Sequence, residues 1–77
     1  MGSDPDSDYV AQGMAFLKHG NYFGAVLAFT RAIVRDPNAA EAYRGRAIAY
    51  DGLGRFDLAS ADRDKLVALR AAHPNGN

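Results

Sequence analysis

The sequence predicts an all-α protein whose four antiparallel helices form two helix-turn-helix hairpins. Its apolar residues recur at spacings of three and four positions, as on helices with one buried face, and not with the alternation typical of strands. Glycine and proline interrupt this pattern at places where turns are expected. The two halves of the chain also align with each other at an offset of 34 residues.

The chain has 77 residues, which is too few for two separately packed cores. We therefore expect a single domain over residues 1–77, and the length excludes a two-domain enzyme. A domain of this size buries only about 60% of the surface that its unfolded chain exposes. Because the chain has no cysteine, neither a disulfide nor a thiolate-bound metal can brace it.

Nine basic and nine acidic side chains give a formal net charge of zero, and neither half of the chain has a marked basic excess. This balance argues against a duplex nucleic-acid binder. The longest apolar run, Ala25 to Phe29, is far shorter than the ~20 residues of a membrane span, and the first nine residues are acidic where a signal peptide is basic. We expect a cytoplasmic protein that binds neither nucleic acid nor membrane.

The first hairpin is predicted to consist of two helices joined by a glycine turn. The first helix should begin within residues 4–8, where Asp and Ser can accept hydrogen bonds from first-turn amides, and end at about His19. Gly20 suits the left-handed conformation that closes a helix. Apolar residues from Tyr22 onward form one stripe along the second helix, which should end near Arg35.

Pro37 should separate the two hairpins, because proline cannot extend the preceding hydrogen-bond ladder. Asn38 and Glu41 stand at the spacing of a capping box. This spacing predicts a third helix that begins after Asn38 and ends at about Gly52.

The second hairpin should close as the first one does, with a turn at Gly54 and a fourth helix from Phe56 to about Ala72. Residues 74–77 should form a loose tail. The fourth helix departs from the first hairpin at Arg63, which stands where Phe29 predicts an aromatic residue, and charged residues surround it. Either the charge forms the polar outer face of a terminal unit, or a weak repeat has decayed; the charged residues are Asp62, Arg63, Asp64 and Lys65.

The 34-residue offset brings residues of the same class into register. It aligns Gly13 with Ala47, Ala15 with Ala49, Phe16 with Tyr50, Gly20 with Gly54, Tyr22 with Phe56, and Ala25 with Ala59. Small residues allow two helices to approach closely, and aromatic residues fill the space between them. This pattern resembles the tetratricopeptide repeat family, whose period is 34 residues.

The resemblance covers roughly residues 6–72 and implies two tandem repeats, at about residues 6–39 and 40–73. The positions that carry it are Tyr9, Gly13, Phe16, Gly20, Tyr22, Ala25, Phe29, Ala32 and Pro37, then Tyr43, Ala47, Tyr50, Gly54, Phe56 and Ala59. Gln12 departs from the leucine that is usual in the family. The resemblance implies a short right-handed solenoid that acts as a scaffold for protein partners, with the first helix of each repeat lining a concave groove.

A peptide or helix of a protein partner is the occupant that the resemblance implies for this groove. The expected groove is an apolar patch with a charged border, formed by Val10, Met14, Leu17, Lys18, Arg44, Ile48 and Asp51. Two other coverings of the apolar patch stay open: a further repeat or capping helix of a longer array, and a second copy of the chain in a homo-oligomer.

Some members of the resembled family bind acidic chaperone C-termini through lysine and asparagine side chains on the groove helices. The equivalent positions here are Val10, Met14 and Gly45, so this ligand class is not expected. No catalytic site, metal or cofactor is expected either. His19 and His73 are far apart in sequence, and no hydroxyl side chain has a histidine within local reach.

Three arginines of the second half, Arg44, Arg46 and Arg55, raise the alternative of RNA contact. Acidic residues are interleaved with them, and the net charge is zero. We therefore expect solvated arginines with local ion pairs, and a protein or peptide partner whose identity the sequence does not give.

Overall fold

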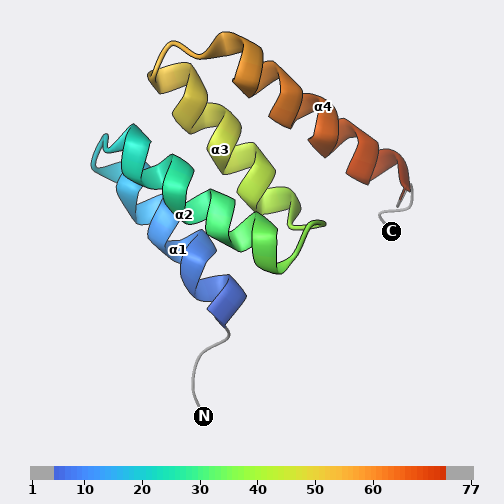
Figure 1. The fold of residues 1–77 in the computed structure, drawn as a ribbon, viewed down its shortest axis with the longest axis horizontal. Helices are drawn as coiled ribbons and strands as arrows, with labels where there is room; N and C mark the ends of the chain where they lie inside the picture. The colour runs from blue at the N-terminus through green and yellow to red at the C-terminus, as the bar shows by residue number, and fades with distance from the viewer. Residues whose placement is uncertain (1–4, 73–77) are drawn as a thin grey trace.

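Four helices follow one another along the chain (Figure 1). They are α1 (Pro5–Lys18), α2 (Tyr22–Arg35), α3 (Ala40–Gly52) and α4 (Phe56–Ala72). The computed structural model describes residues 5–72, with side chains from residue 9 onward. His73 and the expected tail at residues 74–77 lie outside the described residues. Over the described range, the predicted all-α class and the two helix-turn-helix hairpins are confirmed.

The two hairpins stack so that α3 packs against both helices of the first hairpin. Within the hairpins, α1 packs on α2 and α3 packs on α4; between them, α1 and α2 both contact α3. Among the described helices, α4 packs against α3 alone. The first helices of the two hairpins are therefore neighbours, which is the arrangement that the predicted groove requires.

The turns inside the two hairpins are built alike, 34 residues apart. Gly20 and Gly54 both have a φ of 75°, a left-handed conformation that glycine adopts without a Cβ clash. In each turn the amide of the residue after the glycine donates, at 2.8 Å, to the carbonyl oxygen of the aromatic residue four positions before the glycine. The predicted turn glycines are confirmed.

The start of α3 differs from the prediction. Its N-cap residue is Ala39, and no side chain caps it. Asp36 organises the turn instead: its Oδ1 accepts from the amide of Asn38 at 3.0 Å, and its carbonyl oxygen accepts from the amide of Ala39 at 3.0 Å. The predicted capping box of Asn38 and Glu41 is therefore wrong, because the Asp36 carboxylate holds Asn38 within the turn and the helix begins after it.

Phe29 of α2 lies at the centre of the core and is the largest fully buried side chain of the described residues. Its ring lies against a glycine on each neighbouring helix, Gly13 of α1 and Gly45 of α3. A Cβ added at Gly13 would lie 2.6 Å from the Cε1 and Cζ atoms of the ring, and a Cβ added at Gly45 would meet the same Cζ atom. The rest of the buried core cluster consists of Ala25, Ala32, Ala42 and Ala49.

Two aromatic residues that occupy equivalent repeat positions are buried to different extents. Tyr22 packs against the core cluster, and its ring lies so close to Gly52 that an added Cβ would be 2.6 Å away. Phe56, which aligns with Tyr22, is 65% exposed. The difference arises because α3 covers Tyr22, whereas no further described helix packs against α4.

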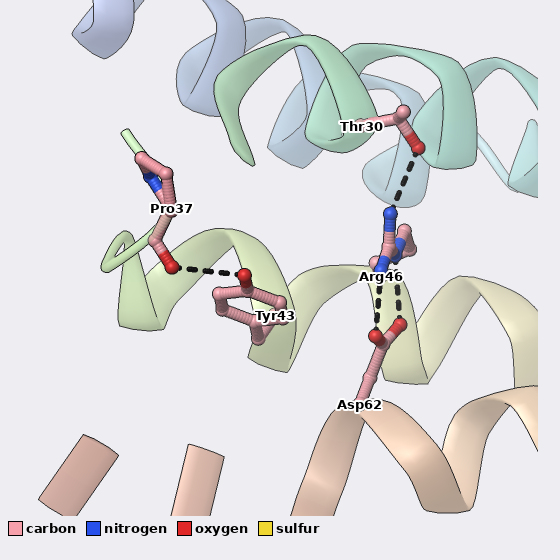
Figure 2. A network of polar contacts seen from close by, with 5 residues as sticks. All are labelled: Thr30, Pro37, Tyr43, Arg46 and Asp62. Carbon is pink, nitrogen blue, oxygen red and sulfur yellow. Dashed lines mark hydrogen bonds and ion pairs between the residues drawn. The ribbon is translucent and has the colours of Figure 1, made fainter. Parts of the chain in front are cut away.

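A buried ion pair joins α3 to α4 and extends to α2 (Figure 2). The Nε and Nη2 atoms of Arg46 donate to the two carboxylate oxygens of Asp62 at 2.8 and 2.7 Å. Its Nη1 atom donates to the hydroxyl oxygen of Thr30 at 3.1 Å. The Asp62 side chain is 6% exposed and that of Arg46 is 19% exposed. One guanidinium therefore connects three helices and both hairpins.

Aromatic rings flank the Arg46 guanidinium, with the ring centroids of Tyr43 and Tyr50 at 5.8 and 5.7 Å from its Cζ atom. The Tyr43 hydroxyl donates to the carbonyl oxygen of Pro37 at 2.8 Å, which fixes that ring (Figure 2). The hydrogen bonds to Asp62 raise the pKa of Arg46 despite its partial burial, so Arg46 stays charged at any pH at which the protein is handled.

Two expectations from the sequence are wrong at this ion pair. Arg46 is not a solvated side chain, and Asp62 is not part of the polar outer face of α4. Packing of α4 on α3 turns both residues inward, toward Thr30 of the first hairpin.

Replacing Gly45 by alanine should destabilise the protein, although alanine normally favours a helix by about 1 kcal/mol over glycine. The added methyl group meets the buried Phe29 ring, and overpacking of this kind costs about 1–3 kcal/mol. The measurement is the free energy of unfolding in urea. Ala68→Gly, at an exposed position of α4, measures helix propensity alone.

A double-mutant cycle with Phe29→Leu tests the cause. The smaller side chain should make room for the methyl group, so that Gly45→Ala costs less in the Phe29→Leu background than in the wild type. Equal costs in both backgrounds would show that the ring does not set the spacing at Gly45.

Removal of one partner of the buried ion pair should be more harmful than removal of both. Asp62→Ala leaves the Arg46 guanidinium without its carboxylate in a largely buried site, and we expect a loss of about 3 kcal/mol in the free energy of unfolding. The double variant Arg46→Met with Asp62→Leu should recover most of that loss. A double variant as unstable as Asp62→Ala would contradict the assigned role of the unpaired charge.

Candidate functional site

The predicted groove residues lie on α1 and α3, which contact each other. Their apolar members differ in the surface that they leave for a partner. Met14 of α1 is 37% exposed and Ile48 of α3 is 49% exposed. Val10 and Leu17 are half-buried and pack against the core cluster. Met14 and Ile48 are therefore the two apolar residues of the predicted groove that are most open to a partner.

The charged border of the predicted groove is already partly paired. Arg44 donates through Nη2 to Glu41 Oε1 at 3.0 Å, and Arg63 donates through Nη1 to Asp51 Oδ2 at 2.8 Å. The side chains of these pairs are 41–61% exposed, and Lys18 is exposed as well. Exposed pairs contribute only about 0–1 kcal/mol, so a polar partner can replace them at little cost. The assignment of all seven residues to one binding site stays a prediction.

Two surface hollows involve the first hairpin. One, of about 160 Å³, is lined by Gln12, Phe16, Gly24, Leu27, Ala28 and Arg31. The other, of about 230 Å³, is lined by Tyr9, Thr30, Arg31, Val34 and Arg35. The Arg35 guanidinium also lies over the Tyr9 ring, with its Cζ atom 5.8 Å from the centroid. Neither hollow includes a residue of the predicted groove.

A larger hollow, of about 390 Å³, lies where the two hairpins meet. It is lined by Phe23, Val26, Tyr50, Leu53, Arg55 and Leu58, from α2, α3, α4 and the turn between α3 and α4. This hollow was not predicted from the sequence, because the resemblance assigns binding to the first helices of the repeats. The available signal was the departure of the second repeat from the first: Leu53 aligns with His19, and Leu58 aligns with Gly24.

The described part of the chain contains no group of three or more His, Asp or Glu residues placed to hold a metal ion. None of its helices is both long enough and apolar enough to span a membrane.

The chain is similar in sequence to Hsp70-Hsp90 organizing protein 3 of Arabidopsis thaliana, with 34% identity over 65 residues. The aligned region is 84% of this chain, but it spans only 12% of the length of that relative. No protein-family model matches the chain, and no solved structure matches it significantly. The observed fold is compatible with two helix-turn-helix repeats of the tetratricopeptide type.

Proposed function

We propose that this chain is a protein-interaction module of the tetratricopeptide repeat type, with repeats at about residues 6–39 and 40–73 and no catalytic activity. The observation that carries the proposal is the pair of neighbouring first helices, α1 and α3, with Met14 and Ile48 exposed on them. The matching turns at Gly20 and Gly54 support the repeat. The similarity to a protein named for organising two chaperones supports a role in protein interaction.

The proposed partner is a peptide or an amphipathic helix that places apolar side chains on Met14 and Ile48. Burial of these side chains is favourable by about 25 cal/mol per Å² of apolar surface, from which the entropy cost of association is subtracted. The unbranched, polarizable side chain of Met14 can adapt to the shape of the partner. Lys18, Arg44 and Asp51 would then flank the bound segment with charges of both signs, which suits polar residues on its outer side.

An acidic chaperone C-terminus is a poor fit to the groove of this chain. A carboxylate clamp needs hydrogen-bond donors, whereas Val10, Met14 and Gly45 stand at the positions that carry the clamp in the resembled family. At Gly45 a longer side chain also has no room, because the Phe29 ring occupies the space next to it. The groove therefore suits an apolar segment better than the acidic C-terminus of a chaperone.

Met14→Glu should abolish binding at the groove with little effect on folding, because Met14 is partly exposed and a carboxylate would oppose an apolar ligand. The ligand is a 12-residue peptide selected from a random displayed library, and its Kd is measured by fluorescence anisotropy. We expect Kd to rise by about tenfold or more, which is about 1.4 kcal/mol. Val34→Glu introduces the same charge at an exposed apolar residue of α2 outside the groove, and should leave Kd unchanged.

The alternative of self-association predicts different results with the same variants. Sedimentation equilibrium at micromolar concentration should give a monomer if the groove is open to peptides. A dimer that Met14→Glu dissociates, together with no selected peptide, would favour the homo-oligomer and contradict the proposed groove.

A further inference from the structure

We propose that the hollow of about 390 Å³ between the hairpins is a second docking site, for a peptide that carries a large apolar side chain next to a carboxylate. The apolar side chain would enter the hollow, and the carboxylate would pair with Arg55. This site is separate from the predicted groove on α1 and α3, and the proposal does not depend on that groove.

The walls of the hollow supply the apolar part of the interaction. Phe23 and Val26 come from α2, Tyr50 from α3, and Leu58 from α4. Phe23 is 65% exposed, although most aromatic side chains of this chain are buried or half-buried. Leu53 and Leu58 are also exposed, whereas Val26 and Tyr50 are half-buried. A concave surface lined by apolar side chains and a single charged group is typical of sites that bind a ligand.

Arg55 supplies the charge that selects the ligand. Among the described residues, its guanidinium has no ion pair and no hydrogen-bond partner. The nearby Asp51 carboxylate is engaged by Arg63 at 2.8 Å. Asp57, two positions along the chain, lies in the first turn of α4, where the helix dipole stabilises its charge. An incoming carboxylate would therefore meet an unpaired cation beside an apolar wall.

Arg55 and Leu58 are not residue types that the helix-turn-helix repeat needs at these positions, because the first repeat has other residues there. At the position equivalent to Arg55, Asn21 caps α2: its Oδ1 accepts from the amide of Gly24 at 2.9 Å. Arginine has no acceptor and cannot make this bond, although a side-chain cap contributes about 1 kcal/mol. The second repeat thus places a cation where the first has a capping residue, next to Leu58 where the first has Gly24.

The test begins with a library of random octapeptides displayed on phage and selected against the full chain. We expect enrichment of peptides that pair an aromatic or large aliphatic residue with Asp or Glu. Binding of a selected synthetic peptide to the ¹⁵N-labelled chain should shift the amide signals of the residues that line the hollow. Replacing the acidic residue of the peptide by its amide should weaken binding by about tenfold, the loss of one charge-assisted contact.

Two matched pairs of variants assign the contacts. Arg55→Gln should weaken binding by about tenfold and remove the preference for the acidic peptide over its amide form, whereas Arg70→Gln, at the far end of α4, should change neither. Phe23→Gln should also weaken binding, whereas Phe56→Gln should not, although both phenylalanines are 65% exposed. Thermal unfolding of each variant checks that the fold is retained.

Several results would overturn the proposal. These are selection of no peptide, binding that is insensitive to Arg55→Gln, and shifts confined to α1 and α3 with sensitivity to Met14→Glu. The last result would leave the proposed groove intact and remove only the second site. A concentration-dependent dimer that buries Phe23 and excludes peptide would assign the hollow to a second copy of the chain instead.

Discussion

The spacing of the two hairpins depends on one aromatic ring. Phe29 projects from α2 into the space between Gly13 of α1 and Gly45 of α3, so three helices meet on a single side chain. The other members of the buried core cluster are alanines, which bring backbones together but fill little volume. The separation of α1 and α3, and with it the surface that they share, is therefore set by the thickness of the Phe29 ring and by the absence of a Cβ on either side.

The Arg46 ion pair adds a directional constraint to this apolar contact. A buried ion pair is weak evidence for stability, because desolvation offsets much of its attraction. Its bonds have strict geometry, however, and Arg46 reaches both Asp62 and Thr30 only when the hairpins stack in this register. The equivalent residues of the first hairpin are Gln12 and Ala28, so the ion pair is specific to the second hairpin, and the bond of Arg46 to Thr30 links it to the first.

The helices and turns could be predicted from the sequence, because helical spacing and turn glycines depend only on residues that are close together in the chain. The cap of α3 was not predicted because the Asp36 carboxylate accepts from the amide of Asn38 and keeps that residue in the turn. The ion pair was missed because Arg46 and Asp62 lie on different helices and come together only when α4 packs on α3. The sequence predicts that the groove residues on α1 are apolar, but it does not predict how far each one is buried. Tertiary packing places Val10 and Leu17 against the core and leaves Met14 partly exposed.

α3 takes part in both proposed surfaces because its opposite faces look toward different neighbours. Ile48 and Tyr50 are two positions apart, about 200° around the helix, so one side chain borders the predicted groove while the other lines the hollow. The chemistry of the two surfaces also differs: the charges around the groove are partly paired within the chain, whereas Arg55 has no partner among the described residues. If both proposals hold, selection for an acidic ligand belongs to the hollow, and the groove selects mainly by apolar shape.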